Sequence, residues 1–255
     1  MTTIQQEEAA ASEKLFPEFK DHLNYVNDVY NLAFRVQTEI EGKRLAEVSD
    51  TAWAQFMILM RITDFLRCIQ LLTIKGYPEQ AGTLTASIFE LAHTAAFFAQ
   101  SPEKAMEWRQ ATSIRQQAPR EIPGINWRKV VRSNCERAGA PGNVEAEYQV
   151  YQQLCWMKHS LPKMQDIRIE SGGVFSLIFG PYTDERAISH AWFAMEHAGR
   201  LTEFVVSHLM EQFGTVEMKV ALQELGEKRA ALKRRGIERF GDENPFANDP
   251  GLPSS

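Results

Sequence analysis

The chain has 255 residues, 44% of them apolar, and a formal net charge of −5 at neutral pH. This composition supports a buried core and argues against an intrinsically disordered chain. The acidic total argues against a protein whose whole surface binds phosphate backbones, although local basic patches can still do so.

The three cysteines, Cys68, Cys135 and Cys155, are odd in number, widely spaced and without a C-x-x-C pair. They predict neither a disulfide framework nor a zinc ribbon. The N-terminus lacks the basic and apolar regions of a secretory signal. No apolar stretch approaches the roughly 20 residues of a membrane-spanning helix. We therefore expect a soluble, cytoplasmic protein without a membrane partner.

The first 75 residues predict a tail and two helices. Residues 1–14 are expected to form a disordered tail. Over residues 15–41 apolar side chains recur near helical spacing, which predicts a long amphipathic helix. A second helix is predicted over residues 50–75, because Ser49 or Asp50 can cap its start.

The next segment predicts the central helix of the fold. Pro78 stands where a proline in the first turn is tolerated, and it opens a helix over residues 78–100. Small residues in its first half permit close approach of neighbouring helices, so we expect this helix to lie at the centre: Ala81, Gly82, Ala86 and Ser87. A fourth helix is predicted over residues 101–117, before two prolines and a glycine break the pattern.

The second half of the chain predicts four more helices. A short helix over residues 126–137 precedes one over 144–159, and a long helix over 184–213 precedes a last helix that ends near residue 240. Between them, β-branched and aromatic runs around a Ser-Gly-Gly turn predict a small β-hairpin at residues 166–180.

The resulting fold class is all-α, a multi-helix bundle with one small β-hairpin insertion. No internal repeat and no linker divides it, so residues 15–240 are expected to form a single helical domain. The turn-rich residues 241–255 are expected to be a disordered C-terminal tail.

Glu90 and His93 form an E-x-x-H pair on one face of the predicted central helix. Carboxylate-bridged metal sites in helical bundles use this spacing, but they need a second such pair and two further glutamates. The chain has no second pair, so we assign no metal or other cofactor, and a metal-binding bundle stays an alternative. A buried Glu90 needs a partner, and Arg61 or Arg67 on the preceding helix is expected to supply it.

One long predicted helix presents Arg186, His190, His197 and Arg200 along a single stripe. Histidine titrates near neutral pH and arginine binds phosphate oxygens with two donors, so this stripe suits acid–base chemistry beside a phosphate. The alternative is an interhelical or solvated face with ordinary hydrogen bonds.

His159 ends a predicted helix, where capping of the free carbonyl groups alone explains a histidine. Its spacing from Cys155 permits a thiol–imidazole couple. Cys155 stands among large apolar residues, however, which favours packing as a small hydrophobe over a role as a nucleophile.

Two basic stretches stand out from the acidic total. Residues 104–137 carry eight Lys or Arg against three Glu, with Trp108 and Trp127 between them, and residues 226–240 carry six against two. A basic helix with aromatic side chains is able to contact RNA or a protein with an acidic surface. The alternative is that both stretches are solvated faces.

The runs KGYPEQAGTLTASIFELAHT and YQQLCWMKHS, followed by a predicted hairpin and a long helix, resemble HEPN-like helical bacterial proteins over residues 45–210. The resemblance implies a helical, commonly dimeric protein of toxin or phage-defence type that acts on RNA. HEPN ribonucleases carry an arginine four to six residues before a histidine on one helix. Here Arg186 and His190 are separated by three residues, and Arg200 and His208 by seven, so the site is not carried over residue by residue.

The leading hypothesis is a HEPN-like bacterial protein that acts on RNA or in a stress or phage-defence system, in its concrete form as a metal-independent ribonuclease. Its candidate catalytic residues are Arg186, His190, His159 and Glu90. A histidine would take the proton from a ribose 2′-hydroxyl while arginine stabilises the developing phosphorane charge. The competing hypothesis is a non-catalytic helical interaction protein that forms a homodimer or binds a partner. Whether the chain is an enzyme is left open.

Overall fold

The computed structural model describes residues 3–44, 47–110, 126–137, 139–158, 167–169, 175–177 and 181–241. Within them, the α-helices are α1 (Ile4–Glu41), α2 (Asp50–Ile74), α3 (Pro78–Gln100), α4 (Pro102–Gln110), α6 (Trp127–Arg137), α7 (Val144–Lys158), α8 (Glu185–Phe213) and α9 (Val216–Phe240). A 3₁₀ turn, η2 (Pro141–Asn143), precedes α7. The prediction of an all-α, multi-helix bundle is confirmed.

The only strands among the described residues are β1 (Ile167–Ile169) and β2 (Phe175–Leu177), which pair antiparallel with Ile167 opposite Leu177. The rest of residues 166–180, including the link between the two strands, lies outside the described residues. The hairpin insertion over that whole segment therefore stays a prediction.

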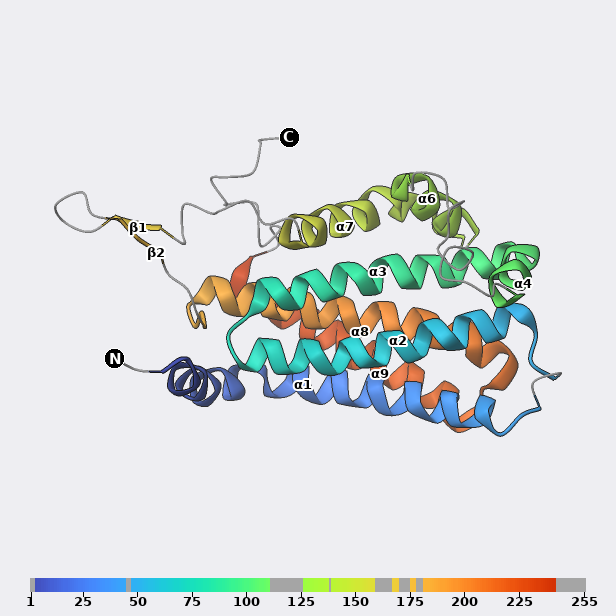
Figure 1. Ribbon diagram of the computed structural model, residues 1–255, viewed down its shortest axis with the longest axis horizontal. Helices are drawn as coiled ribbons and strands as arrows, with labels where there is room; N and C mark the ends of the chain where they lie inside the picture. Colours follow the sequence, from blue (N-terminus) through green and yellow to red (C-terminus); the bar gives the residue numbers. More distant parts are fainter. Residues whose placement is uncertain are drawn as a thin grey trace.

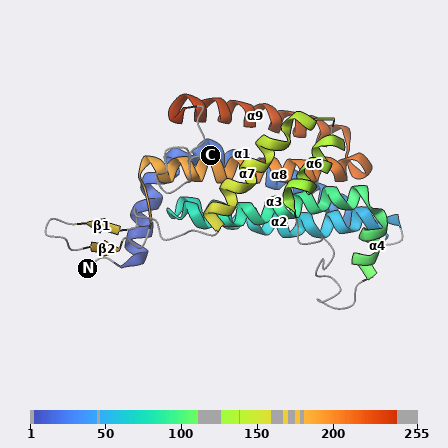
Figure 2. The same cartoon turned by 90° about the horizontal axis from the view of Figure 1, so that it is seen from above.

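The long helices α1, α2, α3 and α8 lie side by side (Figure 1), and α2 and α8 each contact the other three. In the view from above, α8 lies between α9 and the layer of α2 and α3 (Figure 2). The helix α9 packs on α8 and α1, whereas α7 packs on α3 and on α6. This arrangement gives α8 contacts on several sides.

The core consists of apolar side chains at helical spacing from the long helices and α7. The largest of those less than 2% exposed are Leu15, Phe19, Tyr25, Leu59, Ile62, Leu66, Ile69, Ile88, Phe89, Leu154 and Met157. The expected central place of α3 is confirmed, since it packs on α2, α7 and α8. Its small residues matter there, because Gly82 lies directly against Met157 of α7. Thr85 donates a hydrogen bond to the carbonyl of Ala194 in α8 at 3.2 Å.

The predicted disordered tail over residues 1–14 is wrong, because α1 begins at Ile4. Thr3 and Gln6 form a capping box, each side chain bonding the backbone N–H of the other. An alanine run with high helix propensity follows, and Ala11 is buried in the core. The first turns of α1 run at an angle to the rest of the helix (Figure 2), and Pro17 lies within it.

A close approach and a polar contact fix α1 and α9 against α8. A Cβ atom on Gly199 of α8 would lie 2.4 Å from Cε1 of Tyr25 in α1, so only glycine fits there. The Tyr25 hydroxyl donates a short hydrogen bond to Glu203. Glu203 also accepts from Nε of Arg229 in α9 at 3.2 Å. Three helices therefore meet at one buried carboxylate.

None of the described helices is both long enough and apolar enough to cross a lipid bilayer.

Candidate functional site

Glu90 of α3 faces α7. Its carboxylate accepts from Nζ of Lys158 at 3.0 Å and from the hydroxyl of Tyr151 at 3.3 Å. The expectation that Arg61 or Arg67 pairs with it is wrong, because both arginines lie on the exposed face of α2. The charge of Glu90 is therefore balanced at the half-exposed α3–α7 boundary rather than within the core.

One turn further along α3, His93 belongs to a hydrogen-bonded group that we call the Glu147 network. It joins side chains of α3, α6, α7 and α8: His93, Gln100, Ser133, Asn134, Glu147, His197 and Arg200. At its centre the Oε1 atom of Glu147 lies 2.9 Å from Nη2 of Arg200 and 3.4 Å from Nε2 of His93. Nδ1 of His93 accepts from Nδ2 of Asn134 at 2.8 Å.

The charge state of Glu147 follows from these contacts. Burial by itself raises the pKa of its carboxyl, but the hydrogen bond from His93 and the charge of Arg200 outweigh it and lower the pKa to about 2. Glu147 is therefore an anion at neutral pH, and it holds α7 to α3 and α8.

His197 ends the network on the side of α8. Its Nδ1 accepts from Nε of Arg200 at 3.4 Å, so in the neutral ring the proton sits on Nε2. Burial, and after it the charge of Arg200, lower the pKa of His197 to about 3. At neutral pH His197 is therefore an uncharged hydrogen-bond donor through Nε2.

The predicted stripe of Arg186, His190, His197 and Arg200 is divided between different surroundings. His190 is 0% exposed, and its Nδ1 lies 3.8 Å from Oε1 of Glu79. A general base in that position does not touch a substrate without movement of the helices around it. Arg186 is half-buried. Only His197 and Arg200 of this stripe enter the Glu147 network.

Of the other candidate catalytic residues, His159 lies outside the described residues. Cys155 is half-buried, and burial raises the pKa of its thiol. A protonated thiol suits packing rather than nucleophilic attack.

The E-x-x-H pair on α3 is divided as well: Glu90 points to Lys158 and Tyr151, and His93 to Glu147 and Asn134. Across the described ranges, no three His, Cys, Asp or Glu side chains are grouped so as to hold a metal ion.

A pocket of about 400 Å³, which we call the α7–α9 pocket, opens beside His197. Its floor is α8, and its walls come from α7 and α9. The residues that bear on its chemistry are Trp192, Phe193, Glu196 and His197 of α8 and Lys233 of α9. This volume lies within the range of about 300–1,000 Å³ that is usual for small-molecule sites.

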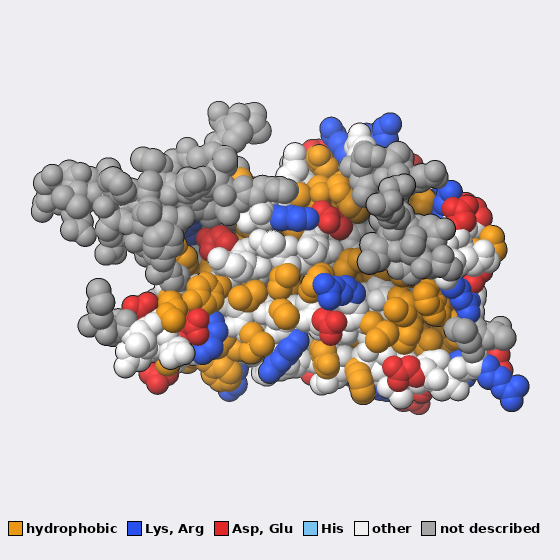
Figure 3. All heavy atoms as spheres, in the orientation of Figure 1, with side chains coloured by type: hydrophobic (Ala, Val, Ile, Leu, Met, Phe, Trp, Pro, Cys, Tyr) orange, Lys and Arg blue, Asp and Glu red, His pale blue; other side chains and the backbone are white. Residues whose placement is uncertain are grey.

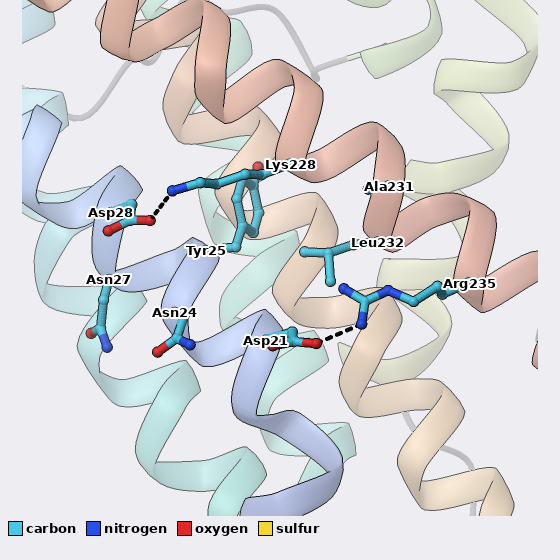
Figure 4. Close-up of a pocket in the computed structure, with 9 residues that line it drawn as sticks. All are labelled: Asp21, Asn24, Tyr25, Asn27, Asp28, Lys228, Ala231, Leu232 and Arg235. Carbon is cyan, nitrogen blue, oxygen red and sulfur yellow. Dashed lines mark hydrogen bonds and ion pairs between the residues drawn. The ribbon is translucent and has the colours of Figure 1, made fainter.

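The basic residues of segment 226–240 are largely paired with acidic residues of the bundle. Figure 4 shows Lys228 and Arg235 of α9 reaching to Asp28 and Asp21 of α1, at 2.7 and 2.5 Å. Further along α9, Arg239 contacts both Glu18 and Glu185. Nearer the start of α9, Arg229 pairs with Glu203 of α8. Most of this positive charge therefore fastens α9 to α1 and α8. An RNA or protein partner for the segment stays a prediction.

Segment 104–137 is described only in part, since residues 111–125 lie outside the described ranges. Arg109 pairs with Asp50 at 2.9 Å and Arg128 with Glu145 at 2.6 Å. Trp108 packs against Trp53 and Phe98, and Trp127 against Tyr151. Both tryptophans therefore contribute to packing between helices, and RNA contact through this segment also stays a prediction.

Sequence patterns pointed to His93, His197 and Arg200, but not to Glu147, Asn134 or Glu196. Glu147 lies in the first turn of its helix, where an acidic residue is ordinary. Nothing in the spacing of the chain connects it to Arg200, 53 residues later. No local signal would have identified it.

We expect Glu147→Gln to lower the free energy of unfolding by about 1–2 kcal/mol at pH 7, because Arg200 and His93 lose a charged acceptor in a half-buried place. Urea denaturation of the purified protein measures it. The contribution of an acid with a lowered pKa is full above its unfolded value near 4.5 and is lost towards its folded value near 2. The difference between the two proteins should therefore shrink as the pH falls through that window.

Glu145→Gln is the matched control on the same helix, because its ion pair with Arg128 is exposed. It should change the stability by less than about 0.5 kcal/mol. Equal effects of the two variants at pH 7 would contradict the central role of Glu147.

In comparisons with known proteins, no family model, no curated protein and no solved structure matches this chain.

Proposed function

We propose that this chain is a non-catalytic helical interaction protein that pairs with a second copy of itself through α2 and the adjoining part of α1. One observation carries the proposal: α2 exposes a row of large apolar side chains at helical spacing. Met57, Met60 and Leu71 are 38, 41 and 48% exposed, and Phe34 of α1 is 58% exposed. Rows of this kind on one face mark interaction surfaces more often than single exposed apolar residues do.

Figure 3 shows many hydrophobic side chains on the α1–α2 side of the molecule, with Lys, Arg, Asp and Glu side chains between them. On α9, by contrast, most of the exposed residues are charged. Removal of an exposed apolar face from water is the usual driving force for association.

The exposed row on α2 is also nearly symmetric about Asp64. Leu71 lies seven residues after Asp64 and Met57 seven before, while Arg67 and Arg61 lie three residues to either side. If two copies of α2 cross antiparallel at Asp64, Met57 meets Leu71 of the other copy. Each Asp64 then lies opposite Asp64 of the other copy, and arginines of both copies lie about one helical turn to either side of this pair. A twofold axis requires this self-complementarity, which favours a second copy over an unrelated partner.

The same geometry places Met60 of one copy opposite the exposed Cys68 of the other. We therefore expect Met60→Cys to form an intermolecular disulfide with the native Cys68 under mild oxidation, seen as a dimer on non-reducing electrophoresis. The wild type should not crosslink, because two Cys68 residues lie about 12 Å apart along the axis at 1.5 Å per residue. Lys219→Cys, on the exposed part of α9, is the matched control and should stay monomeric on the gel.

In light scattering, the wild type should be a dimer at roughly 10 µM, and Met60→Glu a monomer. A wild type that is monomeric at about 1 mM would refute the proposal, as would crosslinking of Lys219→Cys equal to that of Met60→Cys. An RNA-cleavage assay tests the RNA-directed hypothesis. Cleavage of RNA by the purified protein, abolished by His190→Ala, would replace a non-catalytic function by the HEPN-like ribonuclease.

A further inference from the structure

Glu196 of α8 differs from the other carboxylates of the described residues. Each other Asp or Glu that is buried or half-buried there accepts a hydrogen bond or takes part in an ion pair, among them Glu90, Glu147 and Glu203. Glu196 is half-buried, and no described residue bonds to it. Burial raises the pKa of its carboxyl, because water is partly removed and nothing replaces it as a donor.

The place of Glu196 explains what its carboxylate faces. It lines the α7–α9 pocket, into which Lys233 also projects from α9. The charge of Lys233 acts on Glu196, but the two groups form no ion pair within 4.0 Å. Two opposite charges thus border one pocket without neutralising each other directly. A ligand that carries both signs would satisfy both of them.

Gln149, Gln153 and Ser189 also line this pocket, and two further polar groups of its lining are donors. Nε2 of His197 carries the proton of the neutral ring, and Nε1 of Trp192 is a buried N–H group without a hydrogen-bond acceptor in the described structure. A buried donor without an acceptor is costly, and a carboxylate oxygen is a good acceptor for it. The donors and Lys233 favour an anionic group, and Glu196 favours a cationic one.

Much of the remaining lining is apolar or aromatic. Phe193, Val150 and Ile237 come from three different helices, and Phe240 closes the end near the last described residues. A side chain of medium or large size, without charge, fits a lining of this kind.

We propose that the α7–α9 pocket binds a free α-amino acid with a large apolar side chain, its ammonium group on Glu196 and its carboxylate on Lys233 and His197. The aromatic walls receive the side chain. This assignment is independent of pairing through α2, since the pocket lies on α7, α8 and α9.

Three ligands with the same phenyl ring test the proposal by isothermal titration calorimetry at pH 7: phenylalanine, phenethylamine and 3-phenylpropanoate. The first carries both charges, the second only the cation and the third only the anion. We expect phenylalanine to bind at least about tenfold tighter than either of the others, because one charge-assisted hydrogen bond contributes about this factor.

Two variants identify the residues that recognise the charges. Glu196→Gln should remove the advantage of phenylalanine over 3-phenylpropanoate, and Lys233→Met its advantage over phenethylamine. Glu211→Gln on α8 and Lys219→Met on α9 are exposed controls and should change the affinity less than about twofold. Without ligand, Glu196→Gln should raise Tm by about 2–4 °C, because it removes an unpaired half-buried carboxylate, and this also shows that the variant folds.

Failure of phenylalanine to bind at millimolar concentration overturns the proposal. Equal affinity for the three ligands overturns it too, since the charges would then play no part. If phenethylamine binds as tightly as phenylalanine and Lys233→Met has no effect, the pocket selects amines and the assignment to amino acids is wrong.

Discussion

Replacement of Gly199 by alanine is expected to lower the free energy of unfolding by about 3 kcal/mol, although alanine is the better helix former by about 1 kcal/mol. The added Cβ atom would lie 2.4 Å from Cε1 and 2.7 Å from the hydroxyl oxygen of Tyr25. Carbon atoms in contact are normally about 3.5–4.0 Å apart, so α1 and α8 would have to separate. Tyr25 has little freedom to yield, because it is 1% exposed and its hydroxyl is bonded to Glu203.

Equilibrium unfolding in urea measures the loss, and Gly226→Ala is the matched control. Gly226 lies within α9, and a Cβ atom there would meet nothing within 4 Å. Its replacement should raise the stability by about 0.5–1 kcal/mol through helix propensity alone. If Gly199→Ala behaves like Gly226→Ala, then α1 and α8 are not in close contact at this point.

Acidification from pH 6.5 to about 4 is expected to remove about 3 kcal/mol of stability through His22 alone. His22 is 2% exposed and packs against Trp192 with ring centroids 4.4 Å apart. Burial, and after it the charge of Arg235, lower its pKa to about 4, while Asp21 acts in the opposite direction.

The sign follows from proton binding. Between pH 4 and 6.5 an unfolded chain has this histidine protonated, whereas the folded protein keeps it neutral, so falling pH favours the unfolded state. A pKa difference of about 2.5 units corresponds to about 3 kcal/mol. The contribution is full above pH 6.5. His197, with a pKa of about 3, adds to the loss in the same direction.

Urea unfolding of the wild type and of His22→Phe at several pH values between 4 and 7.5 tests this expectation. Phenylalanine keeps a ring against Trp192 but binds no proton, so the stability of the variant should fall less steeply on acidification. The slope due to His197 should remain in both proteins. Parallel curves for wild type and variant would mean that His22 takes up its proton as readily in the folded state as in the unfolded one.

The helices were predictable because their signals are local. Caps such as Ser49 and first-turn residues such as Pro78 act within a few residues, and α2 and α3 begin where these residues predict. The start of α1 was missed because its first turns carry few large apolar residues. The capping box at Thr3 and the run of alanines stabilise these turns instead.

The candidate site was predictable only in part, because helical spacing gives the face of a side chain but not what covers that face. His190 and His197 are seven residues apart on α8. The first is fully buried against Glu79, while the second borders a pocket. Glu90 was correctly expected to need a cation, but its partner is Lys158, 68 residues later in the chain. Which helices meet at a polar residue is decided by tertiary packing.

The basic character of residues 226–240 illustrates the same limit. A run of Lys and Arg indicates that negative charge lies nearby, but not on which molecule. Asp21 and Asp28, some 200 residues earlier, provide much of it within the chain.

The hydrogen bonds of the Glu147 network that start at Ser133 all run, donor to acceptor, towards Glu147. Ser133 donates to Gln100 at 3.2 Å, Gln100 to Asn134 at 2.6 Å and Asn134 to His93, whose remaining N–H points to Glu147. All these dipoles turn their positive ends towards one anion, and each bond polarises the next. The orientations of the Gln100 and Asn134 amides and the tautomer of His93 therefore depend on one another. Protonation of Glu147 would therefore weaken all the hydrogen bonds of this row, including the one that Ser133 of α6 donates.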